Sequence, residues 1–199
     1  MTQLSHKVSN DYIVAVIPAK GKSTRLPNKN ICNVWNKPMV CWSILACEES
    51  KRYNIFPWVN TDSEEIANIA RINKANVCYR DNSIIGNEVP KQEIIRSTLK
   101  FLNLQSIYPD IVISLQANSP QVTGNSLDNA IDKLMKYNKN EIFSVDNNLI
   151  QNAAFRVMRA DYVNNKDLST HCGVIICNAI DVHTKEDIET LEKLDNPHF

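Results

Sequence analysis

The sequence predicts a single α/β domain built on a mainly parallel central sheet, with helices covering both faces. Three observations lead to this fold class. Short apolar runs alternate with segments of helical length along the chain. The length of 199 residues fits one domain with a sizeable core. No internal repeat or linker interrupts the pattern, so residues 12–199 are assigned to one domain and residues 1–11 to a flexible N-terminal tail.

The apolar runs are expected to be strands and the intervening segments helices. Strands are expected at residues 12–17, 55–60, 76–79, 111–115, 141–145 and 172–177. Helices are expected at residues 38–49, 63–73, 90–102, 126–137 and 184–194. Pro38 and Pro90 suit first-turn positions of helices, and Thr184 with Asp187 resembles a capping box. The asparagine-rich residues 146–168 are expected to be irregular.

The overall composition excludes several classes of protein. The chain is formally neutral, with 22 basic and 22 acidic residues, whereas a nucleic-acid footprint needs basic residues spread over one face. No run approaches the ~20 apolar residues of a membrane span. The polar start lacks the apolar stretch of a secretory signal, so a cytoplasmic location is expected. The six cysteines show neither CxxC nor zinc spacing and are expected to be reduced and mostly structural.

Positive charge is concentrated in the loop of residues 19–30, directly after the first predicted strand. The stretch from Tyr12 to Cys47 contains no acidic residue but carries five cations: Lys20, Lys22, Arg25, Lys29 and Lys37. A solvated basic loop is the alternative interpretation. We disfavour it because Pro18 and Pro27 stiffen the segment and no nearby carboxylate neutralises it. The loop therefore predicts a site for a polyanion, and a nucleoside triphosphate is the best small candidate.

The phosphates are expected to bind ammonium and guanidinium groups, helped by backbone N–H groups near Gly21 and Ser23. The chain has only four glycines and contains neither GxGxxG nor a Walker A loop. Rossmann dinucleotide binding and P-loop hydrolysis are therefore disfavoured.

Polar residues also follow the later predicted strands. They lie at residues 61–62, 80–81, 116–120 and 181–183. The carboxyl ends of parallel strands share one edge of an open sheet, and ligands bind in the crevice there. We therefore expect these distant segments to meet the cationic loop at one rim.

The cationic loop also carries a family resemblance. Ile17-Pro-Ala-Lys-Gly-Lys-Ser-Thr-Arg-Leu-Pro-Asn-Lys-Asn30 resembles the signature IPARGGSKxxPxKN of the acylneuraminate cytidylyltransferase (CMP-sialic acid synthetase) family. Its Ser-Thr-Arg-Leu-Pro core is also similar to CMP-KDO synthetases. Further segments match in order: Asn36-Lys-Pro-Met-Val, Val59-Asn-Thr-Asp-Ser-Glu-Glu-Ile-Ala67, Leu115-Gln-Ala-Asn-Ser-Pro120 and Ile180-Asp-Val-His-Thr-Lys-Glu-Asp187.

The resemblance covers roughly residues 12–194 and implies a three-layer, Rossmann-like nucleotide-diphospho-sugar transferase fold. It implies a nucleotidyltransferase that moves CMP from CTP to an acidic sugar, such as a sialic-acid-like nonulosonic acid, and releases pyrophosphate. By position, the nucleotide is expected to contact Lys20, Gly21, Lys22, Ser23, Arg25, Lys29, Asn30 and Arg80. Lys20, Lys29 and Asp181 are expected to act in catalysis.

The nucleotide side departs from the family pattern at several positions. Lys20 replaces an arginine, which keeps the charge but loses the planar fork. Arg80 matches an arginine beside the base, but Asp81 follows it in place of proline. Asn87 and Glu88 replace the family's Asp-Thr. These departures leave the preference for cytosine open.

The acceptor side departs as well. Gln116, Asn118 and Ser119 are expected to bind the sugar, with a turn closed by Ser119 and Pro120 as the alternative. Gln121 and Val122 replace the family's Leu-Arg, so an acceptor other than sialic acid stays open.

The expected metal ligands are Asp181 and His183, at positions where the family has two aspartates that hold Mg²⁺. Residues at i and i+2 of an extended segment point the same way. Mg²⁺ prefers oxygen ligands, so the histidine at position 183 leaves several interpretations open. His183 selects Mn²⁺, binds the ion through water, impairs catalysis, or is only a residue of the turn before a helix. Asp181 is the stronger of the two assignments.

Three alternatives remain open at this level. The segment of residues 144–171 is shorter than the corresponding segment of the full-length synthetases, which carries their dimerisation arm. Whether this chain forms a homodimer is therefore open. The same fold with another nucleotide or sugar is open, and so is a non-catalytic nucleotide-binding subunit.

Overall fold

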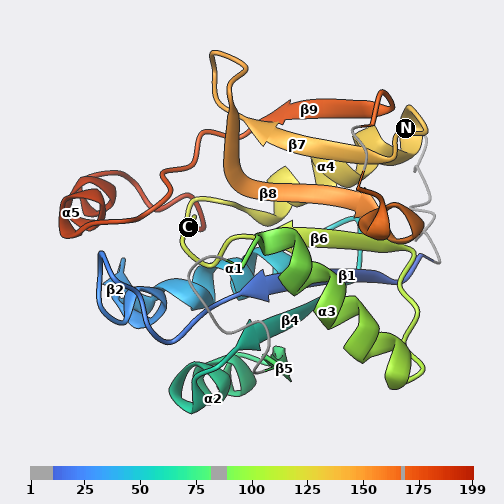
Figure 1. The fold of residues 1–199 in the computed structure, drawn as a ribbon. Helices are drawn as coiled ribbons and strands as arrows, with labels where there is room; N and C mark the ends of the chain where they lie inside the picture. The colour runs from blue at the N-terminus through green and yellow to red at the C-terminus, as the bar shows by residue number, and fades with distance from the viewer. Residues whose placement is uncertain (1–10, 82–88, 167–168) are drawn as a thin grey trace.

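The computed structural model describes residues 11–81, 89–166 and 169–199. Within these residues, seven strands form one sheet in the order β5-β4-β1-β6-β8-β7-β9 (Figure 1). Strand β8 pairs antiparallel with β6 and β7, and the other pairs in this sheet are parallel. The predicted α/β class with a mainly parallel sheet is therefore confirmed.

The six predicted strands all form, each within one residue of the predicted ends. The sheet consists of β1 (Ile13–Pro18), β4 (Ile55–Thr61), β5 (Asn76–Tyr79), β6 (Ile111–Leu115), β7 (Glu141–Val145), β8 (Gln151–Arg159) and β9 (Cys172–Ile176). A separate short hairpin joins β2 (Asn33–Val34) to β3 (Lys37–Pro38). The apolar runs of the sequence mark buried parallel strands, which is why their positions were predictable.

The five predicted helices also form, each within two residues of the predicted ends. They are α1 (Met39–Glu48), α2 (Glu64–Ile72), α3 (Lys91–Leu104), α4 (Gly124–Lys136) and α5 (Lys185–Glu192), with short 3-10 helices η1 (Lys29–Ile31) and η3 (Ala160–Asn164). The capping box of Thr184 and Asp187 is confirmed. Pro38 and Pro90 lie one position earlier than predicted, at the N-caps of α1 and α3.

The prediction that residues 146–168 are irregular is wrong. Most of the described part of this segment forms β8 and η3. Phe155 and Val157 of β8 are buried against Leu115 and Ile113 of β6, whereas Arg156 between them lies on the other face. Arginines interrupt the apolar residues of β8, so it lacks the continuous apolar run of its neighbours and its sequence did not stand out.

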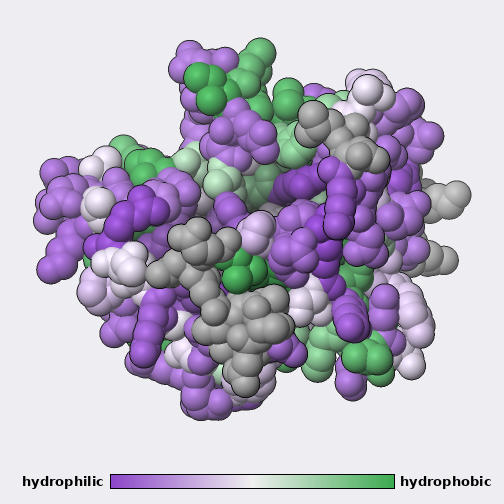
Figure 2. Space-filling model, viewed as in Figure 1, coloured by the Kyte–Doolittle hydropathy of each residue, from purple (hydrophilic) through white to green (hydrophobic). Residues whose placement is uncertain are grey.

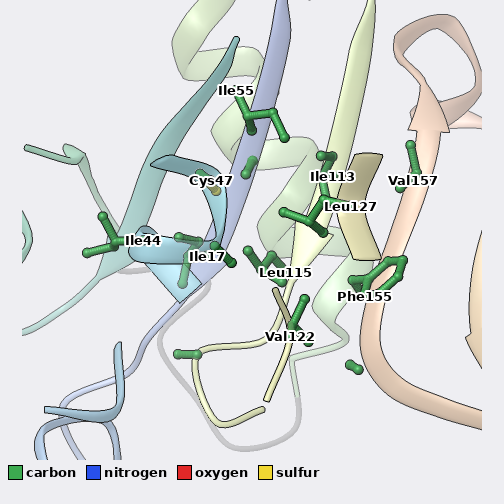
Figure 3. Packing of buried hydrophobic residues seen from close by; sticks show 14 of the residues in the cluster. Ile17, Ile44, Cys47, Ile55, Ile113, Leu115, Val122, Leu127, Phe155 and Val157 are labelled. Atoms are coloured by element: carbon green, nitrogen blue, oxygen red, sulfur yellow. The ribbon is translucent and has the colours of Figure 1, made fainter. Parts of the chain in front are cut away.

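Two hydrophobic layers enclose the sheet. On one face, Ile44 and Cys47 of α1 and Leu127 of α4 belong to the same cluster as Ile17 and Leu115 of the sheet (Figure 3). Helix α2 adds Ile66 and Ala70 to this layer. The opposite face is covered by α3, whose residues include Ile95 and Leu99, and by η3. In Figure 1, α3 lies in front of the sheet and α4 behind it.

A third, smaller hydrophobic cluster lies beyond the carboxyl end of β1. It contains Leu26 of the cationic loop, Val34, Met39, Val182 and Leu191. Because burial of apolar surface stabilises the contact between segments, this cluster holds the loop after β1 against residues 180–191. It thereby brings together two chain segments that the site requires.

The face of the molecule shown in Figure 2 is mostly hydrophilic. Its apolar side chains at the top lie over the turn between β7 and β8, where Leu149 and Ile150 are exposed. Among the helices of the described residues, none has the length and apolar character of a membrane span.

Candidate functional site

The predicted segments meet at one rim of the sheet. The parallel strands β5, β4, β1 and β6 end at the same edge, and the loops that follow them carry the predicted residues. Lys29 Nζ donates a hydrogen bond to the backbone oxygen of Val182 at 3.0 Å, across 153 positions of sequence. The structure therefore places Lys29 beside residues 181–182, as the convergence of the loops predicts.

The electrostatic setting of Lys29 shows which charges lie near it. Burial lowers the pKa of Lys29, the nearby Asp181 carboxylate raises it, and Arg25, Lys20 and Lys91 lower it further. Lys20, Arg25 and Lys91 thus lie near Lys29, and the Asp181 carboxylate lies near both Lys29 and Lys91. Such an arrangement carries an excess of positive charge that a polyanion would neutralise.

Lys91 is a site residue that the sequence analysis missed. It is the first residue of α3, and Asp181 raises its pKa against a larger lowering by burial. Pro90 before it signalled a helix start, and helix N-termini favour anions because of the helix dipole. The proximity of Lys91 to Asp181, however, depends on a tertiary contact that this signal does not reveal.

Asp181 is held in place by its neighbours. Asn118 Nδ2 donates to Asp181 Oδ1 and to the Val182 oxygen, and the Val182 N–H donates to the Asn118 oxygen at 2.9 Å. Asn118 is 5% exposed. His183 Nε2 lies 3.0 Å from the other carboxylate oxygen, Oδ2. Asn118, predicted to bind the sugar, therefore has a positioning contact that the sequence did not reveal.

The cationic loop is fastened at several points. The Gly21 N–H donates to Asp62 Oδ1 at 2.6 Å, and Asn30 Nδ2 donates to the Lys20 oxygen at 2.9 Å. Asn30 is buried, so it orders the loop. Lys22 and Arg25 are exposed, and Ser23 is partly exposed. The loop backbone is therefore fixed while part of its charge faces solvent, which differs from a freely solvated basic loop.

Substituting Gly21 with alanine is expected to disturb this loop. A Cβ at Gly21 would lie 2.8 Å from the Cβ of Ser63, and such overpacking costs about 1–3 kcal/mol. Urea unfolding measures the loss. Ser63 caps α2 through its side chain, and glycine at an N-cap costs only a few tenths of a kcal/mol. The double variant Gly21→Ala, Ser63→Gly should therefore recover most of the stability, and no recovery would contradict the steric account.

Arg80 directly follows β5. It is 9% exposed, and its Nε donates to Asn60 Oδ1 at 2.9 Å. Burial lowers its pKa, and Asp62 partly offsets this effect. A cavity of about 770 Å³ between β5 and α3 reaches Arg80 and Asp81 but not Asp181. The departures at Asn87 and Glu88 lie outside the described residues.

The loop after β6 contains the three predicted sugar contacts, Gln116, Asn118 and Ser119. The backbone oxygen of Gln116 accepts a hydrogen bond from the Ser43 hydroxyl of α1 at 2.8 Å. The Ser119 hydroxyl is buried and finds no partner within the described residues. A buried polar group without a partner is uncommon in folded proteins. His198 secures the end of this loop, because its Nε2 lies 2.8 Å from the Pro120 oxygen.

The donor chemistry at Asp181 fits Mg²⁺ through a single carboxylate. Within the described residues, no cluster of three or more His, Cys, Asp or Glu side chains forms a ready-made metal cage. Mg²⁺ commonly binds one or two carboxylates together with substrate phosphates and waters. His183 offers imidazole nitrogen where an oxygen would suit the ion better.

Comparison with known proteins gives a consistent result. The chain is 31% identical over 134 residues to N-acylneuraminate cytidylyltransferase A of Danio rerio, covering 67% of this chain and 30% of that protein. It is 26% identical over 157 residues to pseudaminic acid cytidylyltransferase of Campylobacter jejuni, covering 77% of this chain and 64% of that protein. The chain therefore spans less than two thirds of the length of either relative.

A solved structure supports the fold. CMP:2-keto-3-deoxy-manno-octonic acid synthetase, complexed with CTP, superposes with a TM-score of 0.73 at 14% identity and covers 92% of this chain and 97% of its own. A cytidylyltransferase from Leptospira borgpetersenii gives a TM-score of 0.68 at 16% identity, covering 94% of this chain and 90% of its own. The family model for cytidylyltransferases matches residues 14–197, nearly the whole described chain. The predicted family is confirmed: the chain belongs to the cytidylyltransferases.

Proposed function

We propose that this chain transfers CMP from CTP to an acidic sugar of the nonulosonic type and releases pyrophosphate. The observation that carries the proposal is the grouping of Lys20, Arg25 and Lys91 near Lys29, with Lys29 hydrogen-bonded to Val182 beside Asp181 at the carboxyl rim of the sheet. Nucleotidyl transfer depends mainly on positioning and charge neutralisation. The relatives named for N-acylneuraminate and pseudaminic acid support an acidic acceptor.

In this mechanism the anomeric hydroxyl oxygen of the sugar attacks the α-phosphorus of CTP in line. A new P–O bond forms, the bond from the α-phosphorus to the bridging oxygen breaks, and pyrophosphate leaves with the electron pair. The hydroxyl proton passes to solvent. Lys20, Lys29, Lys22 and Arg25 bind the triphosphate, and their charge stabilises the negative charge that develops on the leaving group.

Asp181 would hold the divalent ion, with Mg²⁺ as the first candidate and Mn²⁺ as the second because of His183. When bound, such an ion supplies further charge neutralisation at the phosphates. Asn118 keeps the Asp181 carboxylate oriented through the hydrogen bond to Oδ1. Gln116 and Ser119 lie on the neighbouring loop, beside Asn118.

The direct test is an assay of pyrophosphate release with CTP, Mg²⁺ or Mn²⁺ and a panel of nonulosonic acids. We expect release with at least one acidic sugar and CTP. Release only with another nucleotide would replace CTP in the proposal. No release with any sugar, despite CTP binding in calorimetry, would favour the second candidate function, a nucleotide-binding subunit without turnover.

That second candidate has one specific observation behind it. His183 stands beside Asp181 with its Nε2 directed at the carboxylate, so the described residues supply one oxygen-ligand side chain here. If the absence of a second carboxylate at position 183 impairs turnover, then His183→Asp should create activity in Mg²⁺. The proposed function predicts instead that the unaltered chain is active.

A further inference from the structure

We infer that Asn60 and Thr98 are positioning residues for nucleotide binding, because together they fix the orientation of the Arg80 guanidinium. The inference rests on the proposed function, since it takes the nucleotide as the ligand of Arg80. Neither residue was singled out by the sequence, where Asn60 ends a predicted strand and Thr98 lies inside a predicted helix.

Asn60 occupies an unusual place for a polar side chain. It lies in β4, between Pro18 of β1 and Cys78 of β5 in the sheet register, and it is fully buried. Side chains alternate along a strand, so Asn60 shares a face with Trp58, which packs in the layer beneath α3. A buried amide at this position destabilises the fold unless its hydrogen bonds are satisfied.

The hydrogen-bond donors and acceptors fix which way the Asn60 amide points. The Thr98 hydroxyl donates its single proton to the Ile94 oxygen at 2.9 Å, so only its lone pairs face Asn60. The Asn60 atom 2.9 Å from Thr98 Oγ1 must therefore be the donor, Nδ2. Oδ1 then faces Arg80 and accepts from Nε at 2.9 Å. Helix α3 thus orients Arg80 through Thr98 and Asn60.

The remaining guanidinium donors of Arg80 are available to a ligand. Among the described residues, the hydrogen bond from Nε to Asn60 is the one that Arg80 makes through its side chain. Neither Nη1 nor Nη2 is among the buried side-chain atoms that lack a partner within the described residues, and 9% of the Arg80 surface is exposed. Arginine donates through a rigid planar fork. Fixing Nε therefore fixes the direction in which the two terminal amino groups meet an oxygen-rich ligand.

The test measures CTP affinity by calorimetry on the full chain, with folding checked by circular dichroism. Thr98→Val removes the hydroxyl at nearly constant volume and should weaken CTP binding about fivefold to tenfold, because the Asn60 amide loses its fixed direction. Asn60→Leu removes the acceptor and should weaken binding by at least as much. Asn60→Asp keeps an oxygen for Arg80 and should bind more tightly than Asn60→Leu.

A positioning role also predicts that the effects of Thr98→Val and Arg80→Ala on CTP affinity are not additive. In an Arg80→Ala background, Thr98→Val should have no additional effect on CTP affinity, because the residue through which it acts is gone. A purely structural role would lower stability equally in both backgrounds without this non-additivity. If Thr98→Val leaves CTP affinity unchanged while Arg80→Ala weakens it, the inference is overturned and the proposed function stands. If the unaltered chain does not bind CTP, the proposed function fails first.

Discussion

Replacing Asp181 with asparagine is expected to reduce the rate of pyrophosphate release by about 10³-fold, the largest effect on activity. The substitution keeps the shape of the side chain but removes the negative charge that lies among Lys29, Lys91 and their neighbours. It also removes the oxygen ligand that the divalent ion requires. Steady-state kinetics with CTP and the accepted sugar, over a range of Mg²⁺ concentrations, measure the loss.

The matched control is Asp195→Asn, which removes the same charge from an exposed position after α5. It should leave the rate within about twofold, because exposed charges in water interact weakly. Equal activity of the two variants would contradict the assignment of Asp181. A large loss in both would indicate that net charge, rather than the site, controls turnover.

Replacing Asp128 with alanine is expected to lower the free energy of unfolding by about 2–4 kcal/mol, the largest effect on stability. Asp128 of α4 is 2% exposed. It accepts hydrogen bonds from the Ser50 hydroxyl at 2.5 Å and the Lys51 N–H at 3.0 Å, with Arg52 Nε 3.5 Å away. Alanine would leave the Lys51 N–H without this acceptor and would remove the carboxylate that Ser50 and Arg52 face, where α4 meets the chain between α1 and β4. Urea unfolding measures the change.

The control lies one turn later on the same helix. Asp132 also contacts Arg52 and Tyr53, but its side chain is 41% exposed. Asp132→Asn should therefore cost less than about 1 kcal/mol, as is usual for surface ion pairs. If the two substitutions destabilise equally, burial is not what gives Asp128 its importance.

Much of the fold was predictable because buried parallel strands leave a clear pattern. Residues 13–17 are an unbroken apolar run, and 111–115 nearly so. Strand β8 was missed since Arg156 and Arg159 interrupt its apolar residues. Arg156 pairs with the buried Glu141 of β7, a contact between residues that lie 15 positions apart. Such a partner explains how a cation lies within a sheet, but only the folded chain reveals it.

The site was partly predictable because its loops follow strands that were themselves predictable. Loops after parallel strands converge, which placed Lys29 near Asp181. The supporting residues were not predictable, because their roles depend on tertiary contacts. Lys91 looked like an ordinary helix residue, and Asn60 like the end of a strand. The roles of the predicted residues toward nucleotide, sugar and metal stay predictions.

The small hydrophobic cluster beyond β1 has a consequence for affinity. Leu26 and Val182 pack in it together with Leu191, so the folded chain already holds the cationic loop against residues 180–191. Fixing the backbone of one residue costs about 1–2 kcal/mol. CTP would therefore meet a preassembled receptor, and little of its interaction free energy would be consumed in ordering the chain around it.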